Sequence, residues 1–280
     1  MQQRPLGSRT VGAIGLGGMP LSVEGRPDRG RALRTVHAAL DAGVTLLDTA
    51  DAYCLGHDEV GHNERLLADA VRAWGGDRGA VLLATKGGHT RPPDDSWALD
   101  GSREHLRAAC EASLRALGVE AIGLYQLHRP DPQVPYAESV GALEELRQEG
   151  KVVAVGISNA SPDQIRQAAA ITPLAAVQNE LSPAFRSSLR EVALCAELGI
   201  AFLPWSPLGG VGRTGSIAPV FAEVAAARGV SPQQICLAWE LARSPVVIPI
   251  PGASRPETIL DSVAAARLEL DDDELARLNG

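Results

Sequence analysis

The sequence is poor in aromatic residues, which make up 4% of its 280 residues, whereas hydrophobic residues as a whole make up 45%. A core must therefore be built mainly from aliphatic side chains and alanine, as in layered α/β proteins. Cysteine is also scarce, and the four present are far apart, at Cys54, Cys110, Cys195 and Cys236. Without a C-x-x-C pair, neither a zinc site nor a disulfide framework is predicted. The cysteines are expected to be free thiols in the reducing cytoplasm.

Basic residues are not in excess, because 26 lysines and arginines are outnumbered by 34 acidic residues and the net charge is −8. They are scattered among acidic residues, which argues against binding to nucleic acid or to an anionic membrane surface. No stretch approaches the roughly 18 apolar residues of a membrane-spanning helix. The first residues, Met1 to Pro5, lack the apolar run of an export signal. We expect a cytoplasmic protein, and the sequence is silent on its oligomeric state.

What the sequence does contain is a regular alternation of short apolar runs and longer amphipathic segments. Eight runs are predicted to be strands: residues 11–16, 45–47, 81–84, 122–127, 152–157, 174–178, 200–204 and 246–250. The main predicted helices are residues 28–42, 63–73, 102–117, 137–149, 189–198, 218–227, 232–242 and 256–265. No linker interrupts the alternation. It predicts a single α/β domain over residues 1–280, with a parallel sheet closed into a (β/α)8 TIM barrel.

An open, doubly wound sheet is the alternative, because alternation alone does not prove that the sheet closes. Such sheets usually carry a Gly-x-Gly-x-x-Gly nucleotide fingerprint after the first strand. The corresponding stretch is Gly15-Leu16-Gly17-Gly18-Met19-Pro20, where proline stands in place of the third glycine. The sequence therefore favours the closed barrel.

Polar residues stand at the ends of three consecutive predicted strands. Asp48 follows the second strand, Lys86 the third and His128 the fourth, and Tyr53 lies in the loop after Asp48. In a barrel these strand ends converge on one rim, where barrel active sites lie. Because an unpaired buried carboxylate is costly, we expect Asp48 and Lys86 to form an ion pair, with the ammonium near the Tyr53 phenol.

This arrangement suits the reduction of a carbonyl group. A neighbouring cation is expected to lower the pKa of Tyr53 from about 10 toward neutral pH, which would make the phenol a usable acid. A neutral His128 would hydrogen-bond the carbonyl oxygen and orient it. Negative charge develops on that oxygen when hydride is added to the carbon, and none of these side chains carries hydride. The chemistry therefore requires a nicotinamide cofactor.

Seven motifs resemble those of the aldo-keto reductase superfamily over nearly the whole chain. They are LLDTADAY, LLATKGG, YQLHRPD, VGISN, VQNELS, WSPLGG and IPIPGASRPE. The resemblance implies a barrel enzyme that reduces a small aldehyde or ketone, with a catalytic tetrad of Asp48, Tyr53, Lys86 and His128. It also implies cofactor contacts at Gly18, Met19, Ser158, Asn159, Gln178, Trp205, Ser206, Leu208 and Gly210. Of these, Trp205 would stack on the nicotinamide ring.

The far end of the cofactor is expected after the eighth strand. Ser254 and Arg255, at a helix start, offer a hydroxyl, a guanidinium and a helix dipole to the 2′-phosphate of NADPH. Relatives commonly carry lysine, arginine and asparagine at the positions of Gly252, Thr258 and Ser262, so NADH use is also expected to be possible. The resemblance does not identify the substrate, because the chain stops soon after residue 271 and lacks the long C-terminal loop that narrows the pocket of larger relatives.

Other interpretations start from other residues. His57, Asp58, His62 and Glu64 crowd one loop and, with His128, raise the alternative of a metal-dependent hydrolase. A second alternative is a barrel that binds the cofactor but turns over slowly or not at all. Asn63 and Glu64 are expected to cap the helix that follows them. Cys54 adjoins Tyr53, which raises the hypothesis of inhibition by oxidants, although an inert buried thiol is the simpler interpretation.

Overall fold

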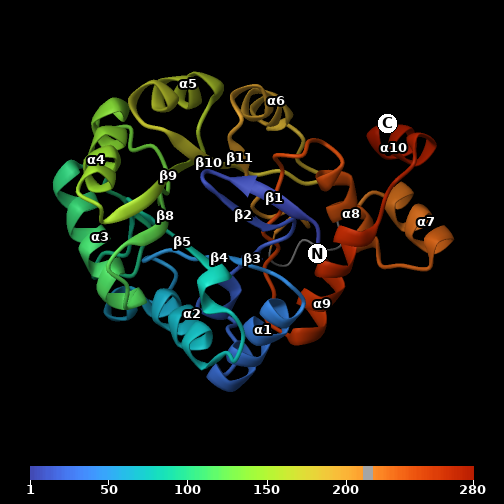
Figure 1. The fold of residues 1–280 in the computed structure, drawn as a ribbon, viewed down its shortest axis with the longest axis horizontal. Helices are drawn as coiled ribbons and strands as arrows, with labels where there is room; N and C mark the ends of the chain where they lie inside the picture. The colour runs from blue at the N-terminus through green and yellow to red at the C-terminus, as the bar shows by residue number, and fades with distance from the viewer. Residues whose placement is uncertain (211–216) are drawn as a thin grey trace.

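The computed structural model describes residues 1–210 and 217–280. Its main feature is a seven-stranded sheet in the order β11-β10-β9-β8-β5-β4-β3, in which every neighbouring pair is parallel. The strands are β3 (Leu16–Gly17), β4 (Leu46–Asp48), β5 (Leu82–Gly87), β8 (Ile122–Leu127), β9 (Val152–Ser158), β10 (Leu174–Gln178) and β11 (Ala201–Phe202). The sheet curls and is surrounded by helices (Figure 1).

The sheet is closed by residues 246–252, which lie between β11 and β3. Parallel bridges join Val247 to Phe202 and Gly252 to Gly17. The Gly15 amide also donates to the Pro249 carbonyl at 2.9 Å. The segment is not a regular strand because two of its residues, Pro249 and Pro251, have no N–H to donate. The predicted (β/α)8 barrel is therefore confirmed, and the alternative of an open sheet is wrong.

The start of the chain differs from the sequence prediction. Residues 11–16 were expected to form the first barrel strand, but residues 9–12 belong to an antiparallel hairpin of β1 (Gln3–Leu6) and β2 (Arg9–Gly12). Leu6 and Val11 of this hairpin pack against Leu46 and Leu82, which begin barrel strands. The hairpin therefore covers the N-terminal end of the barrel. Apolar alternation could not separate a covering strand from a barrel strand, because both bury one face.

The helices lie outside the barrel (Figure 1). They are α1 (Arg29–Asp41), α2 (His62–Ala73), α3 (Arg103–Leu117), α4 (Tyr136–Gln148), α5 (Pro162–Ile171), α6 (Leu189–Leu198), α7 (Pro219–Arg228), α8 (Pro232–Leu241), α9 (Pro256–Ala264) and α10 (Asp272–Asn279). Side-chain caps define several starts, and Ser161 with Gln164 forms a capping box on α5. Within the described residues, no helix has the length and apolar character needed to span a membrane.

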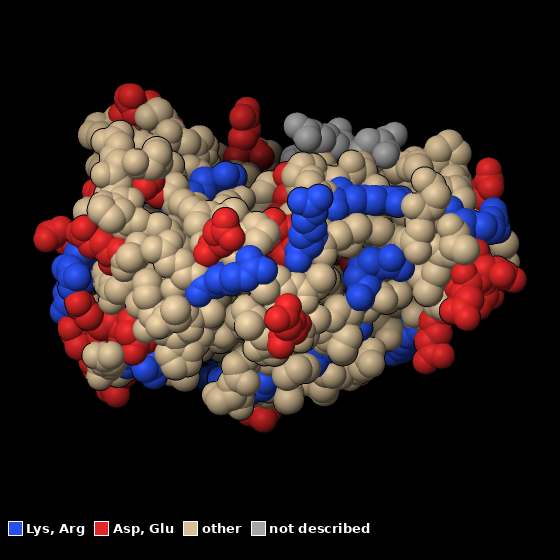
Figure 2. All heavy atoms as spheres, turned by 90° about the horizontal axis from the view of Figure 1, so that it is seen from above, with Lys and Arg blue, Asp and Glu red and all other residues tan. Residues whose placement is uncertain are grey.

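The low aromatic content is reflected in the barrel interior, which is filled by small and aliphatic side chains such as Ala84, Leu124, Ala176 and Ile248. A second apolar layer lies between the strands and the helices. Most charged residues lie outside the core, and on the face shown in Figure 2 basic side chains lie among acidic ones. Several of them are paired, for example Arg107 with Glu149 and Arg228 with Glu274. No segregated basic surface is visible on this face.

One buried acid stands apart from this pattern. Glu240 on α8 is fully buried, and neither of its carboxylate oxygens has a hydrogen-bond partner in residues 1–210 and 217–280. Burial raises the pKa of this carboxyl well above its ordinary value. In the unfolded chain the group ionises near about 4.3, whereas in the folded protein it stays protonated. Stability therefore falls as the pH rises above this value, because ionisation favours the unfolded state.

We expect Glu240→Met to raise the free energy of unfolding by about 1 to 3 kcal/mol at pH 8, because the substitution removes an unsatisfied buried polar group. The gain should be smaller at pH 5, where the unfolded chain is partly protonated. Urea denaturation at the two pH values measures the difference. Glu197→Met on α6 is the control, since Glu197 is exposed. Equal gains at both pH values would contradict the proposed titration.

Candidate active site

Four polar side chains from three neighbouring strand ends meet at one rim of the barrel. Asp48 ends β4, Lys86 lies near the end of β5, His128 follows β8, and Tyr53 belongs to the loop after β4. Lys86 Nζ donates to Asp48 Oδ2 at 2.6 Å and to the Tyr53 hydroxyl at 3.1 Å. The Lys86 side chain is fully buried and the other three are nearly so. The expected ion pair and its contact with the phenol are therefore present.

The buried ion pair has a full set of hydrogen bonds. Lys86 also donates to the Thr49 carbonyl at 2.8 Å, and Asp48 Oδ1 accepts from Gln178 Nε2 at 2.8 Å and from Gln126 Nε2 at 3.3 Å. Such satisfaction is needed because two buried charges otherwise lose more solvation than they gain in attraction. Gln126 was missed by the sequence reasoning, although a polar residue inside the apolar run 122–127 was a signal for it.

The electrostatics of Tyr53 differ from the sequence expectation. Burial raises the pKa of the phenol above 10, and the opposing effect of Lys86 does not reverse this shift. The expected lowering toward neutral pH is therefore wrong for the protein on its own, since loss of solvent outweighs one neighbouring cation. For Lys86, burial lowers the pKa, but Asp48 and Tyr53 together raise it above the usual value. The phenol is protonated and the amine is charged at neutral pH.

His128 lies beside the phenol as a neutral ring. Its centroid is 5.6 Å from that of Tyr53, with the two planes nearly perpendicular. Burial, followed by the charge of Lys86, lowers the pKa of His128 well below its usual value. Its Nδ1 is buried without a hydrogen-bond partner among the described residues. A neutral imidazole next to a protonated phenol provides two hydrogen-bonding groups for one carbonyl oxygen.

Three further predicted residues lie against this group. Ser158, the last residue of β9, donates from Oγ to the Gln178 carbonyl at 2.7 Å. Asn159 follows with a φ of 58°, and its Nδ2 donates to the His128 carbonyl at 3.0 Å and to Ser158 Oγ at 2.9 Å. Asparagine is one of the few residue types that adopt a positive φ readily. Gln178 reaches Asp48 as described above, so these three residues adjoin the group formed by Asp48, Lys86, Tyr53 and His128.

The predicted residues after β11 form the next part of the rim. The Trp205 amide donates to the Asn179 carbonyl at 3.1 Å, and Trp205 Nε1 is buried without a partner in the described chain. Ser206 and Gly210 have φ values of 51° and 92°, and Leu208 packs against the core. Residues 211–216, which follow Gly210, lie outside the described residues.

Gly18 and Met19 follow β3, which pairs with the Asp48 strand β4 on the side away from β5. The Gly18 amide donates to the Asp48 carbonyl at 2.7 Å, and a Cβ at Gly18 would lie 2.6 Å from Asn63 Oδ1. Met19 is exposed at the rim. Asn63 does not cap α2 as expected, because it is buried and bonds to Thr49, Gly18 and Ser22. It joins two loops of the rim instead.

Ser254 and Arg255 lie at the start of α9. Arg255 is the exposed N-cap residue and Ser254 is partly buried next to it. A Cβ at Gly252 would lie 2.7 Å from Pro20 Cγ, so a larger residue at this position would require Pro20 to shift. Glycine at position 252 has no side chain that could reach a phosphate, whereas the Arg255 side chain is exposed to solvent.

Three of the residues considered for a metal site make other contacts. His57 Nδ1 lies 2.6 Å from the Arg91 carbonyl, His62 Nδ1 lies 2.8 Å from Ser22 Oγ, and Glu64 accepts from Thr85 at 2.6 Å. In the part of the chain that the structure describes, no group of three or more histidine, cysteine, aspartate or glutamate residues could hold a metal ion.

Cys54 is buried beside Tyr53. Burial raises the pKa of its thiol above the ordinary value. Because the thiolate is the reactive form, a raised pKa disfavours oxidation. The structure therefore favours the inert interpretation of Cys54 over that of an oxidant-sensitive thiol.

The chain is similar to known proteins over nearly its whole length. The sequence model of the aldo/keto reductase family matches residues 13–280. An uncharacterized oxidoreductase of Schizosaccharomyces pombe is 33% identical over 98% of this chain and 88% of its own length. Among solved structures, a glycerol dehydrogenase from Gluconobacter oxydans superposes with a TM-score of 0.86 at 26% identity, covering 99% of this chain and 94% of that one. An aldo/keto reductase from Klebsiella pneumoniae in complex with NADP and acetate has a TM-score of 0.81 at 28% identity and covers 100% and 95%.

Proposed function

Because the chain belongs to the aldo/keto reductase family of oxidoreductases, we propose that it transfers hydride from NADPH to the carbonyl carbon of an aldehyde or ketone, with Tyr53 as the proton donor. The observation that carries this proposal is the position of Lys86 Nζ between Asp48 Oδ2, at 2.6 Å, and the Tyr53 hydroxyl, at 3.1 Å. An ammonium held in this way stabilises the phenolate that remains after the proton has been given to the substrate.

Each side chain of the tetrad has a defined task in this proposal. Tyr53 holds its proton at neutral pH, because burial raises its pKa, and it gives the proton to the oxygen as charge develops there. His128 is neutral and orients the carbonyl oxygen by a hydrogen bond. Asp48 compensates the charge of Lys86. When bound, the nicotinamide supplies the hydride, which no side chain can provide.

The residues present fit a nicotinamide dinucleotide. Ser158, Asn159 and Gln178 lie next to the catalytic group and would hold the carboxamide, and Trp205, whose Nε1 has no partner among the described residues, would stack on the ring. Gly18, Met19, Ser206, Leu208 and Gly210 would line the remaining path. Support for this cofactor class comes from the Klebsiella pneumoniae structure, which contains NADP.

The choice of NADPH rests on the start of α9. Ser254 and Arg255 combine a hydroxyl, an exposed guanidinium and the positive end of a helix dipole, which together suit a phosphate dianion. Gly252 contributes no side chain, and the start of α9 has no further cation nearby in sequence. We therefore infer that NADPH is preferred and that NADH is also accepted.

We expect Arg255→Ala to weaken NADPH binding by about tenfold while changing NADH binding little, since a charge-assisted hydrogen bond is worth about 1.5 to 3 kcal/mol and only NADPH carries the 2′-phosphate. Fluorescence titration with each cofactor measures both dissociation constants. Arg267→Ala is a control, because Arg267 is also an arginine close to α9 but lies beyond its C-terminal end. Equal losses for both cofactors in Arg255→Ala would show that the phosphate is bound elsewhere.

The proposed enzyme is a single barrel domain over residues 1–280 that acts on small carbonyl compounds in the cytoplasm. All four cysteines are free and buried, which supports a reducing compartment. The direct test is to mix purified protein with NADPH and 4-nitrobenzaldehyde and to follow the loss of NADPH absorbance. Cofactor-dependent turnover would support the proposal. Tight NADPH binding without turnover on any aldehyde or ketone would instead favour a cofactor-binding protein.

A further inference from the structure

Gln126 is a polar residue in the apolar interior of the barrel. Along β8, Leu124 belongs to the interior cluster, whereas Tyr125 and Leu127 pack in the layer between the strands and the helices. Because side chains alternate along a strand, Gln126 shares the interior face with Leu124. Gln126 is fully buried. A buried amide costs free energy unless it is hydrogen-bonded, so the partners of Gln126 show what this position does.

The amide of Gln126 contacts Asp48 and Gln178. Its Nε2 donates to Asp48 Oδ1 at 3.3 Å, and its Oε1 accepts from Gln178 Nε2 at 3.5 Å. A carboxylate only accepts hydrogen bonds, so contact with Asp48 requires the nitrogen end of the amide to face it. Among the described residues, the Gln126 side chain makes no other hydrogen bond. The only charged group that its amide binds there is therefore the Asp48 carboxylate.

The neighbouring strands place this amide beside the ion pair. Gln126 pairs with Lys86 of β5 on one side and with Gly156 of β9 on the other. Paired residues of adjacent strands point their side chains to the same face of the sheet. A Cβ at Gly156 would lie 2.8 Å from Gln126 Cγ and 3.2 Å from Gln126 Oε1. The absence of a side chain at Gly156 therefore leaves the space that the amide occupies.

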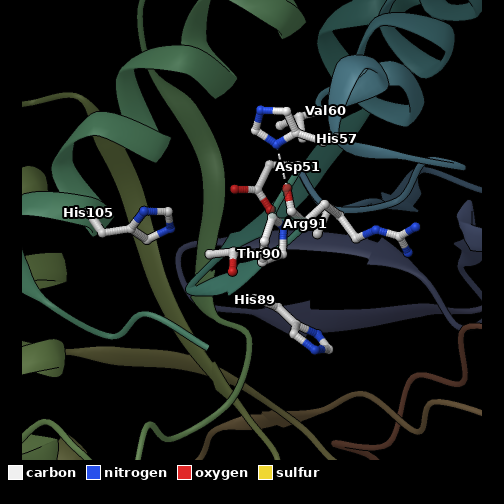
Figure 3. A pocket seen from close by; sticks show the side chains of 9 residues that line it. Asp51, His57, Val60, His89, Thr90, Arg91 and His105 are labelled. Atoms are coloured by element: carbon white, nitrogen blue, oxygen red, sulfur yellow. Dashed lines mark hydrogen bonds between the residues drawn. The ribbon is translucent and has the colours of Figure 1, made fainter. Parts of the chain in front are cut away.

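Gln126 does not belong to the open space beside the site. A cavity of about 300 Å³ lies between the loops after β4 and β5, and Asp51 and His105 lie on opposite sides of it (Figure 3). Its wall includes β6 (His89–Thr90), which forms a short hairpin with β7 (Ala98–Leu99). Gln126 does not line this cavity. Because it is also fully buried, any effect of Gln126 on turnover must be exerted through the residues that it binds.

Two amides on one oxygen fix the direction of the Asp48 carboxylate. Oδ1 accepts from Gln178 at 2.8 Å and from Gln126 at 3.3 Å, while Oδ2 lies 2.6 Å from Lys86 Nζ. A carboxylate without these donors could turn about its Cβ–Cγ bond and bring both oxygens to the ammonium. The ammonium would then be drawn away from the Tyr53 hydroxyl, which lies 3.1 Å from it. Holding Oδ1 thus maintains the contact that stabilises the phenolate.

We propose that Gln126 is a positioning residue for the reduction: its hydrogen bond to Asp48 Oδ1 keeps Oδ2 on Lys86 and keeps the ammonium at the Tyr53 hydroxyl. Gln178 is also assigned to the cofactor carboxamide, whereas Gln126 is buried and stays with Asp48 throughout the reaction. The inference rests on the proposed function, since it adds a residue to the same site.

The first test is Gln126→Met, which removes the amide and fills its space with an apolar side chain. We expect the single-turnover rate constant for reduction of 4-nitrobenzaldehyde by NADPH to fall about 5- to 20-fold, because a hydrogen bond to a charged group is lost. The dissociation constant of NADPH should stay within twofold of wild type. Urea denaturation checks that the variant is folded under the assay conditions. A rate constant within twofold of wild type would overturn the proposal.

The matched control is Gln234→Met. Gln234 on α8 also donates from Nε2 to an aspartate, Asp261 Oδ1, at 2.6 Å, but neither residue belongs to the candidate site. This variant should retain the wild-type rate constant within twofold. An equal loss in Gln126→Met and Gln234→Met would show that removing such an amide anywhere in the fold lowers turnover, and it would contradict the proposal.

The isosteric variant Gln126→Glu tests the hydrogen bond itself. Its carboxyl can donate to Asp48 only while it is protonated. Two adjacent carboxyl groups favour retention of one proton, because like charges repel. We expect this variant to keep most of the wild-type rate constant at pH 6 and to lose it as the pH rises and the proton is released. A loss at pH 6 as large as that of Gln126→Met would contradict the role of Gln126 as a donor.

A double-mutant cycle with Asp48→Asn separates this role from general packing. If Gln126 acts through the Asp48 carboxylate, adding Gln126→Met to Asp48→Asn should change the rate constant by less than twofold. If Gln126→Met lowers the rate constant by the same factor in both backgrounds, the two sites act independently and the proposal is wrong.

These experiments distinguish the positioning role from the proposed function. If the wild-type protein reduces the aldehyde and Gln126→Met is equally active, only the positioning role is refuted. Failure of the wild-type protein to reduce any aldehyde or ketone refutes the proposed function and this inference with it.

Discussion

Replacing Tyr53 with phenylalanine is expected to lower kcat for carbonyl reduction by about 10²- to 10⁴-fold, which is the usual contribution of a positioned general acid. The phenol accepts a hydrogen bond from the Lys86 ammonium at 3.1 Å, and it is protonated at neutral pH. Its removal takes away the proton that the developing alkoxide requires. Cofactor affinity should remain nearly unchanged, because the proposed nicotinamide contacts are made by other residues.

Stopped-flow reduction of 4-nitrobenzaldehyde, together with NADPH titration, separates these effects. The control is Tyr125→Phe, since Tyr125 is a fully buried tyrosine whose hydroxyl bonds to the Leu106 carbonyl outside the tetrad. That variant should retain turnover within a few fold. Unaltered turnover in Tyr53→Phe would remove Tyr53 from the mechanism, whereas equal losses in both variants would indicate a general effect of removing buried hydroxyl groups.

Lys86→Met should damage both turnover and stability. The substitution leaves the Asp48 carboxylate buried with hydrogen bonds from Gln126 and Gln178 but without a cation. Breaking a buried ion pair from one side costs about 3 to 5 kcal/mol of folding stability. Turnover should fall at least as far as in Tyr53→Phe, because the phenolate formed by proton donation loses its stabilising charge.

A double variant distinguishes the two effects. In Lys86→Met with Asp48→Asn, no charge remains to be compensated, so most of the lost stability should return in urea denaturation while turnover stays low. Recovery of turnover in the double variant would show that Lys86 serves only to neutralise Asp48. Lys151→Met, which removes pairs with Glu111 and Glu149 near the surface, is the control and should change stability little.

The comparison between sequence and structure is clearest at particular residues. Asp48 and Lys86 could be paired from the sequence because each follows a strand, and parallel strand ends must meet at one rim. The hairpin at residues 3–12 could not be separated from the barrel, because its apolar residues alternate as those of a barrel strand do. The eighth strand was placed correctly by its apolar residues, although Pro249 and Pro251 prevent regular pairing.

The role of Asn63 is a second feature that the sequence did not predict. An asparagine just before an amphipathic segment is a common helix cap, but here it binds Thr49, Gly18 and Ser22 and thereby connects two loops of the rim. The partners are 14, 45 and 41 residues away in the chain. Local sequence cannot reveal such contacts, because they depend on how the loops are brought together.

The sequence by itself determined the alternation of strands and helices and the polar side chains at the strand ends, because periodicity and strand ends are local properties. Closure of the barrel was decided by the bridges that join residues 246–252 to β11 and β3. The tertiary structure decided the protonation of those side chains. Tyr53 was expected to become more acidic beside Lys86, yet its pKa is raised, since burial removes more stabilisation from a phenolate than one cation restores. It also placed Asp51 and His105 across one cavity. Which side chains are buried and which lie opposite one another is decided by packing between distant segments of the chain, and no local sequence pattern encodes that packing.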